Sequence, residues 1–205
     1  EYQFKPEPPF TLGVDFAGVV LDPGSPESSG FTVGQRVAGV NLNGGAAEVV
    51  ANPVIFTFAL PDELSFDEGA ALGINFQTAL FALDTRAHLQ PGETVGVLGA
   101  AGGVGVATIA VAKALGARVV AIVHRDGAEE MLREVGADEV VPLREGWGAR
   151  IKELTGSGLD VLVDPVGGEV FDEALRQVAP DGRFVVVGFA AGGIPTVKLN
   201  RVLFR

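Results

Sequence analysis

The chain has 205 residues, of which 47% are hydrophobic and 20% are charged, and its formal net charge is −11. This composition is that of a globular protein with enough apolar material for a core, and it excludes a disordered chain. The negative charge disfavours non-specific binding to nucleic acid or to an anionic membrane surface, so neither is predicted as a partner. Because the chain contains no cysteine, disulfides and cysteine-ligated zinc are excluded, which fits a reducing compartment.

The first residue of the chain bears on whether the protein is processed, and the lengths of its apolar runs bear on its location. The chain begins at Glu1 and its only methionine is Met131, so we expect a fragment or a processed protein. No apolar run reaches the length of a membrane span, and no signal-peptide pattern opens the chain. A cytoplasmic protein is therefore predicted.

Residues 1–60 carry short apolar runs separated by Gly, Pro, Asn and Ser. Runs of this kind predict strands joined by turns, and together they indicate part of a small β-barrel. The expected strands are Phe16–Leu21, Gln35–Val40, Ala46–Ala51 and Val54–Leu60. Residues 61–92 then change character: Ser65 and Glu68 have the spacing of a capping box, and an apolar helix is expected over residues 75–83.

From residue 94 the pattern alternates between strands and helices. Strands are expected at residues 94–98, 118–123, 139–141, 159–164 and 183–188, and helices near residues 104–115, 128–135, 147–154 and 170–178. This alternation predicts an α/β fold with a doubly wound parallel sheet of the Rossmann type. The five strands are one fewer than the six of a full dinucleotide-binding domain.

The turn after the first of these strands carries the chemistry. It contains Ala100-x-Gly102-x-x-Gly105, the dinucleotide fingerprint with Ala in place of its first Gly. Gly102 lets the backbone approach a pyrophosphate, and Gly105 lets the helix pack closely on the strand. The following helix offers free N–H groups and a partial positive charge. The predicted pyrophosphate site comprises Ala101, Gly102, Gly103, Val104 and Gly105.

The end of the second strand decides between the two nicotinamide cofactors. A site for NAD places an acidic residue about 20 residues past the fingerprint, where it binds the ribose 2′-OH. Here the residues are His124, Arg125 and Asp126. Arg125 can hold a 2′-phosphate with help from His124, which favours NADPH. Two alternatives stay open: Arg125 is a solvated turn residue, or Asp126 points inward and selects NADH.

Several segments in order along the chain resemble the zinc-independent quinone oxidoreductases of the medium-chain dehydrogenase/reductase superfamily. The matching segments include residues 9–20, 34–37, 45–48, 60–61, 89–95, 99–105, 112–117, 136–138, 164–168 and 182–190. The resemblance implies part of a GroES-like β-barrel domain followed by a Rossmann domain. The expected boundaries are 1–60 for the barrel, 61–92 for a connecting helical segment and 93–205 for the dinucleotide-binding domain, incomplete at its C-terminus.

The resemblance also bears on zinc and on the nicotinamide. Zinc-dependent relatives have a His ligand where this chain has Val14, so no metal is predicted. Asp15 beside it is expected to cap a turn or pair with an arginine. The resemblance places the nicotinamide near Asn75, Thr78, Val166, Gly188 and Phe189. Asp164 either contacts the cofactor directly or caps a turn.

The resemblance is weaker at the adenosine end. The family often has a Lys at the position of Ala128 and a Tyr near Pro142 and Leu143, and this chain has neither. The implied function is hydride transfer from NADPH, or from NADH, to a quinone or other conjugated carbonyl. One alternative is an enoyl reductase acting on enoyl thioesters or alkenals, and another is a non-catalytic dinucleotide-binding sensor or structural protein. Catalytic residues stay unassigned, and a homodimer is expected.

Overall fold

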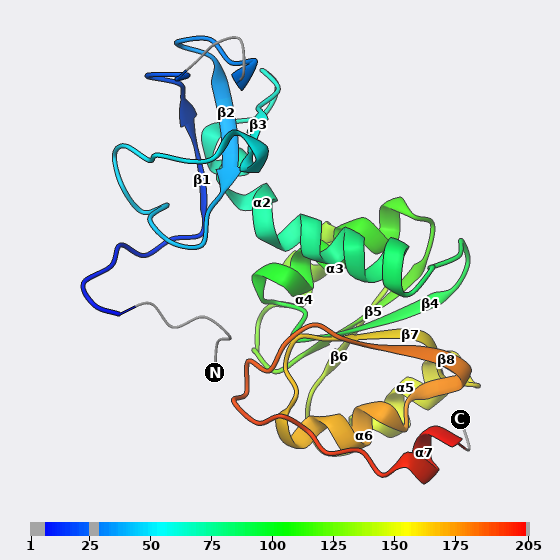
Figure 1. Cartoon of the computed structure of the whole chain (residues 1–205). Helices are drawn as coiled ribbons and strands as arrows, with labels where there is room; N and C mark the ends of the chain where they lie inside the picture. Colours follow the sequence, from blue (N-terminus) through cyan, green and yellow to red (C-terminus); the bar gives the residue numbers. More distant parts are fainter. Residues whose placement is uncertain (1–6, 25–28, 204–205) are drawn as a thin grey trace. The chain divides into compact units, whose positions relative to one another are not determined.

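The computed structural model describes residues 7–24 and 29–203, and the chain divides into two compact units, Tyr2–Gln77 and Thr78–Arg205. The first unit contains an antiparallel sheet in the order β1-β2-β3 (Figure 1). Its strands are β1 (Asp15–Val19), β2 (Arg36–Val40) and β3 (Thr57–Ala59), and a 3-10 turn, η1 (Val54–Phe56), precedes β3. The expected strands around residues 16–21, 35–40 and 54–60 are thus confirmed with shorter bounds.

The strand expected at Ala46–Ala51 is wrong. These residues form bends and a loop, and residues 46–49 are exposed, so the segment has no buried face to stabilise a strand. Its start is held against residues 12–13 instead: the Gly45 N–H donates to the Gly13 carbonyl at 2.9 Å and the Ala46 N–H to the Leu12 carbonyl at 2.8 Å.

Helix α2 (Phe66–Leu80) follows β3. Its start is the expected capping box: the Ser65 N–H donates to the Glu68 carboxylate at 2.7 Å, and the Glu68 N–H donates to Ser65 Oγ at 3.2 Å. The Ser65 N–H and the Ser65 hydroxyl, which also donates to the Glu68 carboxylate at 2.7 Å, together hold the pKa of Glu68 below its ordinary value. The helix continues without a break into a π-helical turn, η2 (Phe81–Arg86).

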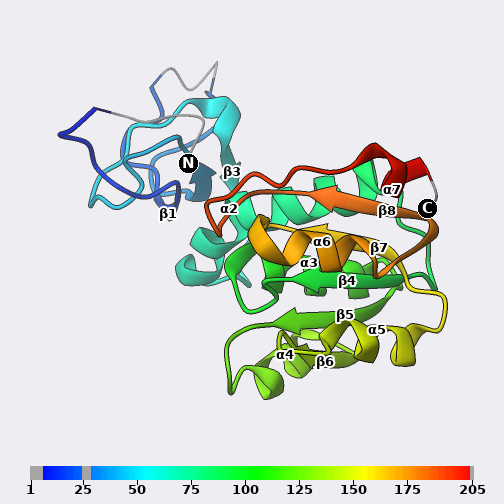
Figure 2. The same ribbon diagram turned by 90° about the horizontal axis from the view of Figure 1, so that it is seen from below.

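The second unit contains a parallel sheet in the order β6-β5-β4-β7-β8 (Figure 2). This is the order of the first five strands of a Rossmann fold. The strands are β4 (Thr94–Leu98), β5 (Arg118–Val123), β6 (Glu139–Pro142), β7 (Leu159–Asp164) and β8 (Val178–Val186). The helices are α3 (Gly103–Ala114), α4 (Glu129–Val135), α5 (Trp147–Thr155), α6 (Phe171–Leu175) and α7 (Leu199–Leu203), with a 3-10 turn, η3 (Gly168–Val170), before α6.

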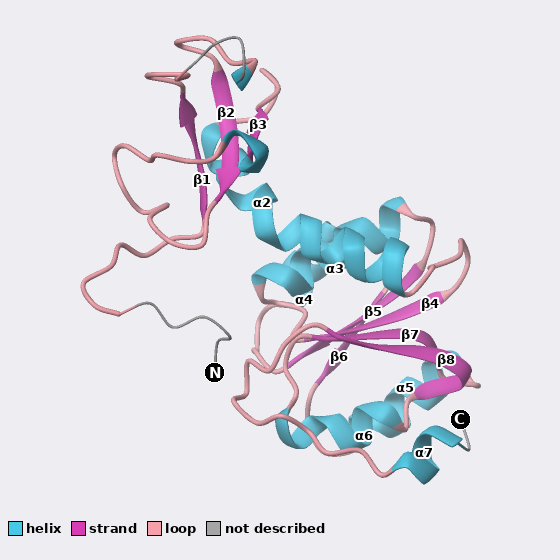
Figure 3. Cartoon of the chain, viewed as in Figure 1, coloured by secondary structure: helices cyan, strands magenta, loops and turns pink. Residues whose placement is uncertain are grey.

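Helices cover both faces of this sheet (Figure 3). On one face, α3 and α4 bury Ile109, Ala112 and Leu132 against strand residues such as Val97 and Ala121. On the other face, α5 and α6 bury Ile151 and Ala174 against a second set of strand residues, Leu98, Val120, Ile122 and Leu162. Alternate residues of each strand face opposite layers, which confirms the doubly wound α/β prediction.

The last strand and the helix before it differ from expectation. The helix expected over residues 170–178 is limited to α6, and β8 starts at Val178 rather than at residue 183. The reason is a backbone pairing with β7: the Leu159 N–H donates to the Gln177 carbonyl at 2.8 Å, and the register between β7 and β8 then shifts. Because β8 ends at Val186, Gly188 and Phe189 lie in the loop that follows it.

No helix within the described residues is both long enough and apolar enough to cross a membrane.

Candidate dinucleotide-binding site

The glycine-rich turn between β4 and α3 leaves the start of α3 open. Gly99 has a positive φ of 59° and accepts a hydrogen bond from the Gly102 N–H at 2.9 Å, which closes the turn. Gly102 is the N-cap of α3, in extended conformation and without a side-chain cap. The first N–H groups of a helix have no partner within it, and Gly102 and Gly103 are exposed. The turn therefore presents unfilled donors and the positive end of a helix.

Gly105 and Gly102 differ in how much space surrounds their Cα atoms. A Cβ on Gly105 would lie 2.4 Å from the Gly99 carbonyl oxygen and 2.7 Å from the Ala100 Cα. A Cβ on Gly102 would meet only the Gly99 oxygen, at 3.3 Å. Gly105 is thus required for α3 to pack on the turn, whereas Gly102 keeps the space above the helix free. The packing role expected of Gly105 is thus observed, and the approach of a pyrophosphate at Gly102 stays a prediction.

Residues 124–127 form an exposed loop directly after β5. Because β4 and β5 are parallel neighbours, this loop and the glycine-rich turn lie at the same edge of the sheet. Among the described residues, no side chain pairs with the Arg125 guanidinium. Asp126, in contrast, forms an ion pair with Arg144.

The turn after β7 lies against the glycine-rich turn. A Cβ on Gly99 would lie 2.9 Å from Val166 Cγ2. The Asp164 carboxylate sets the shape of this turn, because its Oδ1 accepts hydrogen bonds from the Val166 N–H at 2.8 Å and the Gly167 N–H at 2.9 Å. Asp164 is fully buried, and its Oδ2 has no partner within the described residues. Of the two roles expected for Asp164, the structure shows the turn cap.

The loop after β8 joins the same region. The Val187 N–H donates to the Asp164 carbonyl at 2.8 Å, and the Gly188 N–H approaches it at 3.4 Å. Phe189 lies beside Gly167, on which a Cβ would lie 3.0 Å from Phe189 Cδ1. Val166, Gly188 and Phe189 are therefore brought together. Thr78 lines a pocket of about 520 Å³ together with residues 183–187, which are the last residues of β8 and the first residue after it. Asn75 belongs to the other unit, and its role stays a prediction.

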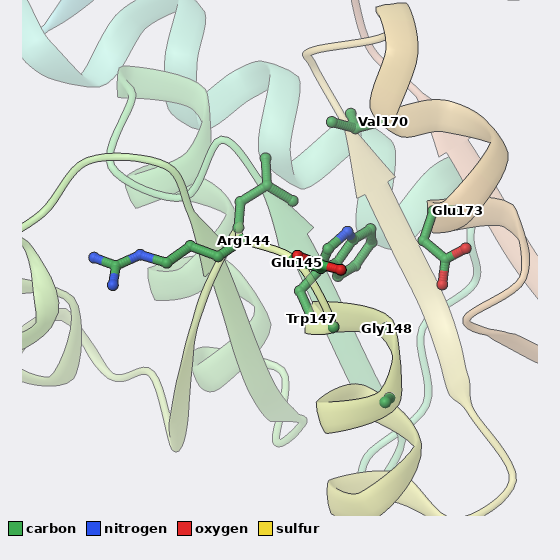
Figure 4. Close-up of a pocket in the computed structure, with 9 residues that line it drawn as sticks. Arg144, Glu145, Trp147, Gly148, Val170 and Glu173 are labelled. Atoms are coloured by element: carbon green, nitrogen blue, oxygen red, sulfur yellow. The ribbon is translucent and has the colours of Figure 1, made fainter.

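A second pocket, of about 590 Å³, opens where the chain leaves β6 and where η3 and α6 follow β7. Trp147 and Val170 provide apolar walls, and Glu173 contributes a carboxylate (Figure 4). The Trp147 side chain also packs against the core on this face of the sheet. Figure 4 shows that the Arg144 side chain extends away from Trp147 and Glu173. The sequence pattern did not single out Arg144, although its place just after β6 repeats that of Arg125 after β5.

Metal ligands do not gather among residues 7–24 and 29–203: no group of three His, Cys, Asp or Glu side chains is placed to hold an ion. Asp15, next to Val14, has a structural role. Its Oδ1 accepts a hydrogen bond from the Ile74 N–H of α2 at 2.7 Å. The approach depends on Gly73, because a Cβ there would lie 2.0 Å from that oxygen.

Two family models match the chain. The model described as "Zinc-binding dehydrogenase" matches residues 103–205, and the model described as "Alcohol dehydrogenase GroES-like domain" matches residues 1–62. Among curated proteins, "Quinone oxidoreductase-like protein 2" of Bos taurus is 40% identical over 208 residues, which cover 100% of this chain and 59% of the bovine protein. The chain thus spans well under two thirds of the length of this relative.

Solved structures agree with the fold. A probable oxidoreductase from Mycobacterium abscessus is 42% identical with a TM-score of 0.84, covering 93% of this chain and 64% of that one. A mycobacterial protein solved in complex with NADPH is 31% identical with a TM-score of 0.89, covering 98% and 63%. The enoyl reductase CurK is 32% identical with a TM-score of 0.83, covering 94% and 57%.

The order of the sheet, the open glycine-rich turn and both family models lead to one assignment. The chain belongs to the quinone oxidoreductase-like family of the medium-chain dehydrogenase/reductase superfamily, with GroES-like and Rossmann-type domains.

Proposed function

We propose that this protein transfers a hydride from NADPH to a quinone or another conjugated carbonyl compound, without zinc. The observation that carries the proposal is the open start of α3 beside the glycine-rich turn, with Arg125 unpaired within the described residues at the end of the adjacent strand. Backbone donors there suit a pyrophosphate, and a free guanidinium suits a further phosphate.

The residues present fit a dinucleotide. Ala101, Gly102, Gly103, Val104 and Gly105 would hold the pyrophosphate, because the start of α3 is open and a Cβ on Gly102 would narrow it. His124 and Arg125 would hold the adenosine 2′-phosphate. Val166, Gly188 and Phe189 would lie along the nicotinamide with Asn75 and Thr78. Such a cofactor supplies a hydride, which is the two-electron reductant of the reaction.

The work of the protein is then to bind, orient and exclude water. Reduction of a quinone to a hydroquinone takes up the hydride and one proton. The proton comes from solvent or from a donor group of the protein. The turn held by Asp164 fixes Val166 against the glycine-rich turn, so it keeps the nicotinamide side of the site rigid. No acid-base group is needed to generate the nucleophile, because the cofactor carries it.

The preference for NADPH over NADH rests on the loop after β5. Arg125 is free within the described residues, and Asp126 is already engaged by Arg144, so the acidic residue that would select a ribose 2′-OH has a partner. The mycobacterial structural relative in complex with NADPH supports this choice.

Calorimetric titration with NADPH and with NADH at matched low salt tests the proposal. We expect NADPH to bind more tightly by about tenfold, or about 1.4 kcal/mol, and Arg125→Ala to erase that difference. The matched control is Arg150→Ala, which removes an exposed arginine of α5 that pairs with Glu153. Equal affinities in the wild type would contradict the NADPH preference, and no binding of either cofactor would contradict the dinucleotide site.

Zinc independence has its own test. Val14 has no ligand atom, and the chain has no cysteine, so a metal chelator is expected to leave NADPH oxidation unchanged. A loss of activity with the chelator that zinc restores would overturn this part of the proposal.

An enoyl reductase is the second candidate, because the solved enoyl reductase CurK shares the fold over 94% of this chain. NADPH oxidation driven by enoyl thioesters or alkenals, but not by quinones, would favour it. Tight NADPH binding without oxidation by either substrate class would instead favour a dinucleotide-binding sensor.

The remaining assignments are also proposals. We place the domain boundaries at 1–60, 61–92 and 93–205, and we propose a cytoplasmic homodimer.

A further inference from the structure

The ion pair between Asp126 and Arg144 lies in the loops that follow two neighbouring strands. Asp126 is in the loop after β5 and Arg144 is just after β6. The Leu143 N–H donates to the Val123 carbonyl at 2.7 Å, so the two chain segments are still paired where the strands end. The backbone of Arg144 is also fixed, because its carbonyl accepts the Trp147 N–H at 3.1 Å at the start of α5.

From this we propose that Arg144 determines cofactor specificity: it holds Asp126 away from the ribose in the free protein and becomes a second cation for the 2′-phosphate when NADPH binds. The inference rests on the dinucleotide site proposed above. It concerns a residue outside that site's predicted set, and it gives the loop a second cation beside Arg125.

The pair is built to exchange partners. The Arg144 and Asp126 side chains are 68% and 82% exposed, and an exposed ion pair contributes little to stability. A phosphate dianion offers the guanidinium more charge and a bidentate geometry, so it competes well with one carboxylate. Arg144 can therefore leave Asp126 without loss of the fold.

Asp126 explains why Arg144 acts on both cofactors. An acidic residue in the loop after the second strand accepts the ribose 2′-OH of NADH, and it repels a 2′-phosphate. While Arg144 is paired with Asp126, the carboxylate is neutralised and withheld from the ribose. Without Arg144, the same carboxylate is free to bind the 2′-OH, and the 2′-phosphate loses a partner and meets an uncompensated charge.

The test is calorimetric titration of the whole chain with NADPH and with NADH, using Arg144→Ala, Asp126→Asn and the double variant. We expect Arg144→Ala to weaken NADPH binding by about tenfold and to leave NADH binding unchanged or tighter. Asp126→Asn is expected to strengthen NADPH binding and to leave NADH binding within about twofold. The double variant should bind NADPH more tightly than Arg144→Ala alone, because the repulsive carboxylate is gone.

Two control variants and the salt dependence of binding distinguish a specific role of Arg144 from a general effect of surface charge on cofactor affinity. Arg150→Ala and Glu153→Gln break another exposed ion pair, on α5, and should leave the ratio of NADPH to NADH affinity unchanged. Added salt should weaken NADPH binding more than NADH binding in the wild type, and this difference should shrink in Arg144→Ala.

The outcomes distinguish the two proposals. Arg144→Ala could keep the wild-type ratio of NADPH to NADH affinity while Arg125→Ala still erases the preference for NADPH. That result would overturn the role of Arg144 and leave the proposed function intact. If the wild type binds neither cofactor, both proposals fail.

Discussion

At the scale of single residues, substitutions at two glycines of the turn are expected to have different effects: Gly105→Ala on stability and Gly102→Ala on cofactor binding. Gly105→Ala puts a Cβ within 2.7 Å of backbone atoms of Gly99 and Ala100, which cannot move without shifting α3. We expect it to lower the free energy of unfolding by about 1–3 kcal/mol, as overpacking does. Chemical denaturation followed by circular dichroism measures the change.

Gly102→Ala is the matched comparison for that experiment. Its Cβ meets a single backbone oxygen at 3.3 Å, and Gly102 already has an extended conformation, so stability should change by less than about 0.5 kcal/mol. NADPH affinity should nevertheless fall by at least about tenfold, because the methyl group occupies the approach to the helix start. Unchanged affinity in Gly102→Ala would argue against pyrophosphate binding at this turn.

Asp164 provides a second prediction at this scale. Asp164→Ala leaves the Val166 and Gly167 N–H groups without their acceptor, and an unsatisfied buried donor costs about 1–3 kcal/mol. Asp164→Asn keeps an acceptor oxygen for these two N–H groups, so it should recover most of that stability. Thermal unfolding of both variants measures the effect. Equal destabilisation by Ala and Asn would contradict the turn-cap role of Asp164.

At the scale of elements, one ion pair joins the start of β4 to β8. Arg183 donates to both oxygens of the Glu93 carboxylate, at 2.9 and 2.5 Å, and to the Ala87 carbonyl at 3.0 Å. The hydrogen bond from Arg183 holds the pKa of Glu93 below its ordinary value of 4.5. A carboxyl whose pKa is lower in the folded state stabilises the fold above pH 4.5, and this stabilisation is lost as the pH falls through the lowered value.

Glu93→Gln tests this pair. We expect it to reduce stability at neutral pH by about 1–2 kcal/mol and to flatten the decline in stability below about pH 4.5. Glu153→Gln, which alters an exposed pair on α5, should change neither by a measurable amount. Urea unfolding at a series of pH values measures both effects. If stability falls as steeply with decreasing pH in Glu93→Gln as in the wild type, the stabilising role of the Glu93–Arg183 pair is contradicted.

The elements also show which sequence signals were sufficient. The segments 94–98, 118–123 and 159–164 are mainly apolar and rich in valine, and they predicted β4, β5 and β7 with their observed bounds, because strands buried on both faces need no alternation. Residues 46–51 have similar composition but remain outside the sheet. The start of β8 at Val178 was missed because it depends on a backbone pairing with Leu159, and side-chain pattern does not report such pairings.

At the scale of the whole molecule, the sequence predicted the fold class and the place of the glycine-rich turn, because strand-helix alternation and glycine spacing are local signals. The hydrogen-bond and ion-pair partners of Asp126 and Asp164 could not be predicted from local sequence signals. Asp126 is separated from Arg144 by a helix and a strand, and they meet only because β5 and β6 are neighbours. Likewise, only the folded turn after β7 shows that Asp164 caps it.

The most direct test of the central claim is hydrogen exchange of the whole chain with and without saturating NADPH. The dinucleotide site predicts slower exchange at the N–H groups of residues 101–105, where α3 begins, and in the loop of residues 124–127. Exchange in α7 (Leu199–Leu203), which is outside the proposed site, should not change. Protection elsewhere with none at the start of α3 would contradict the claim.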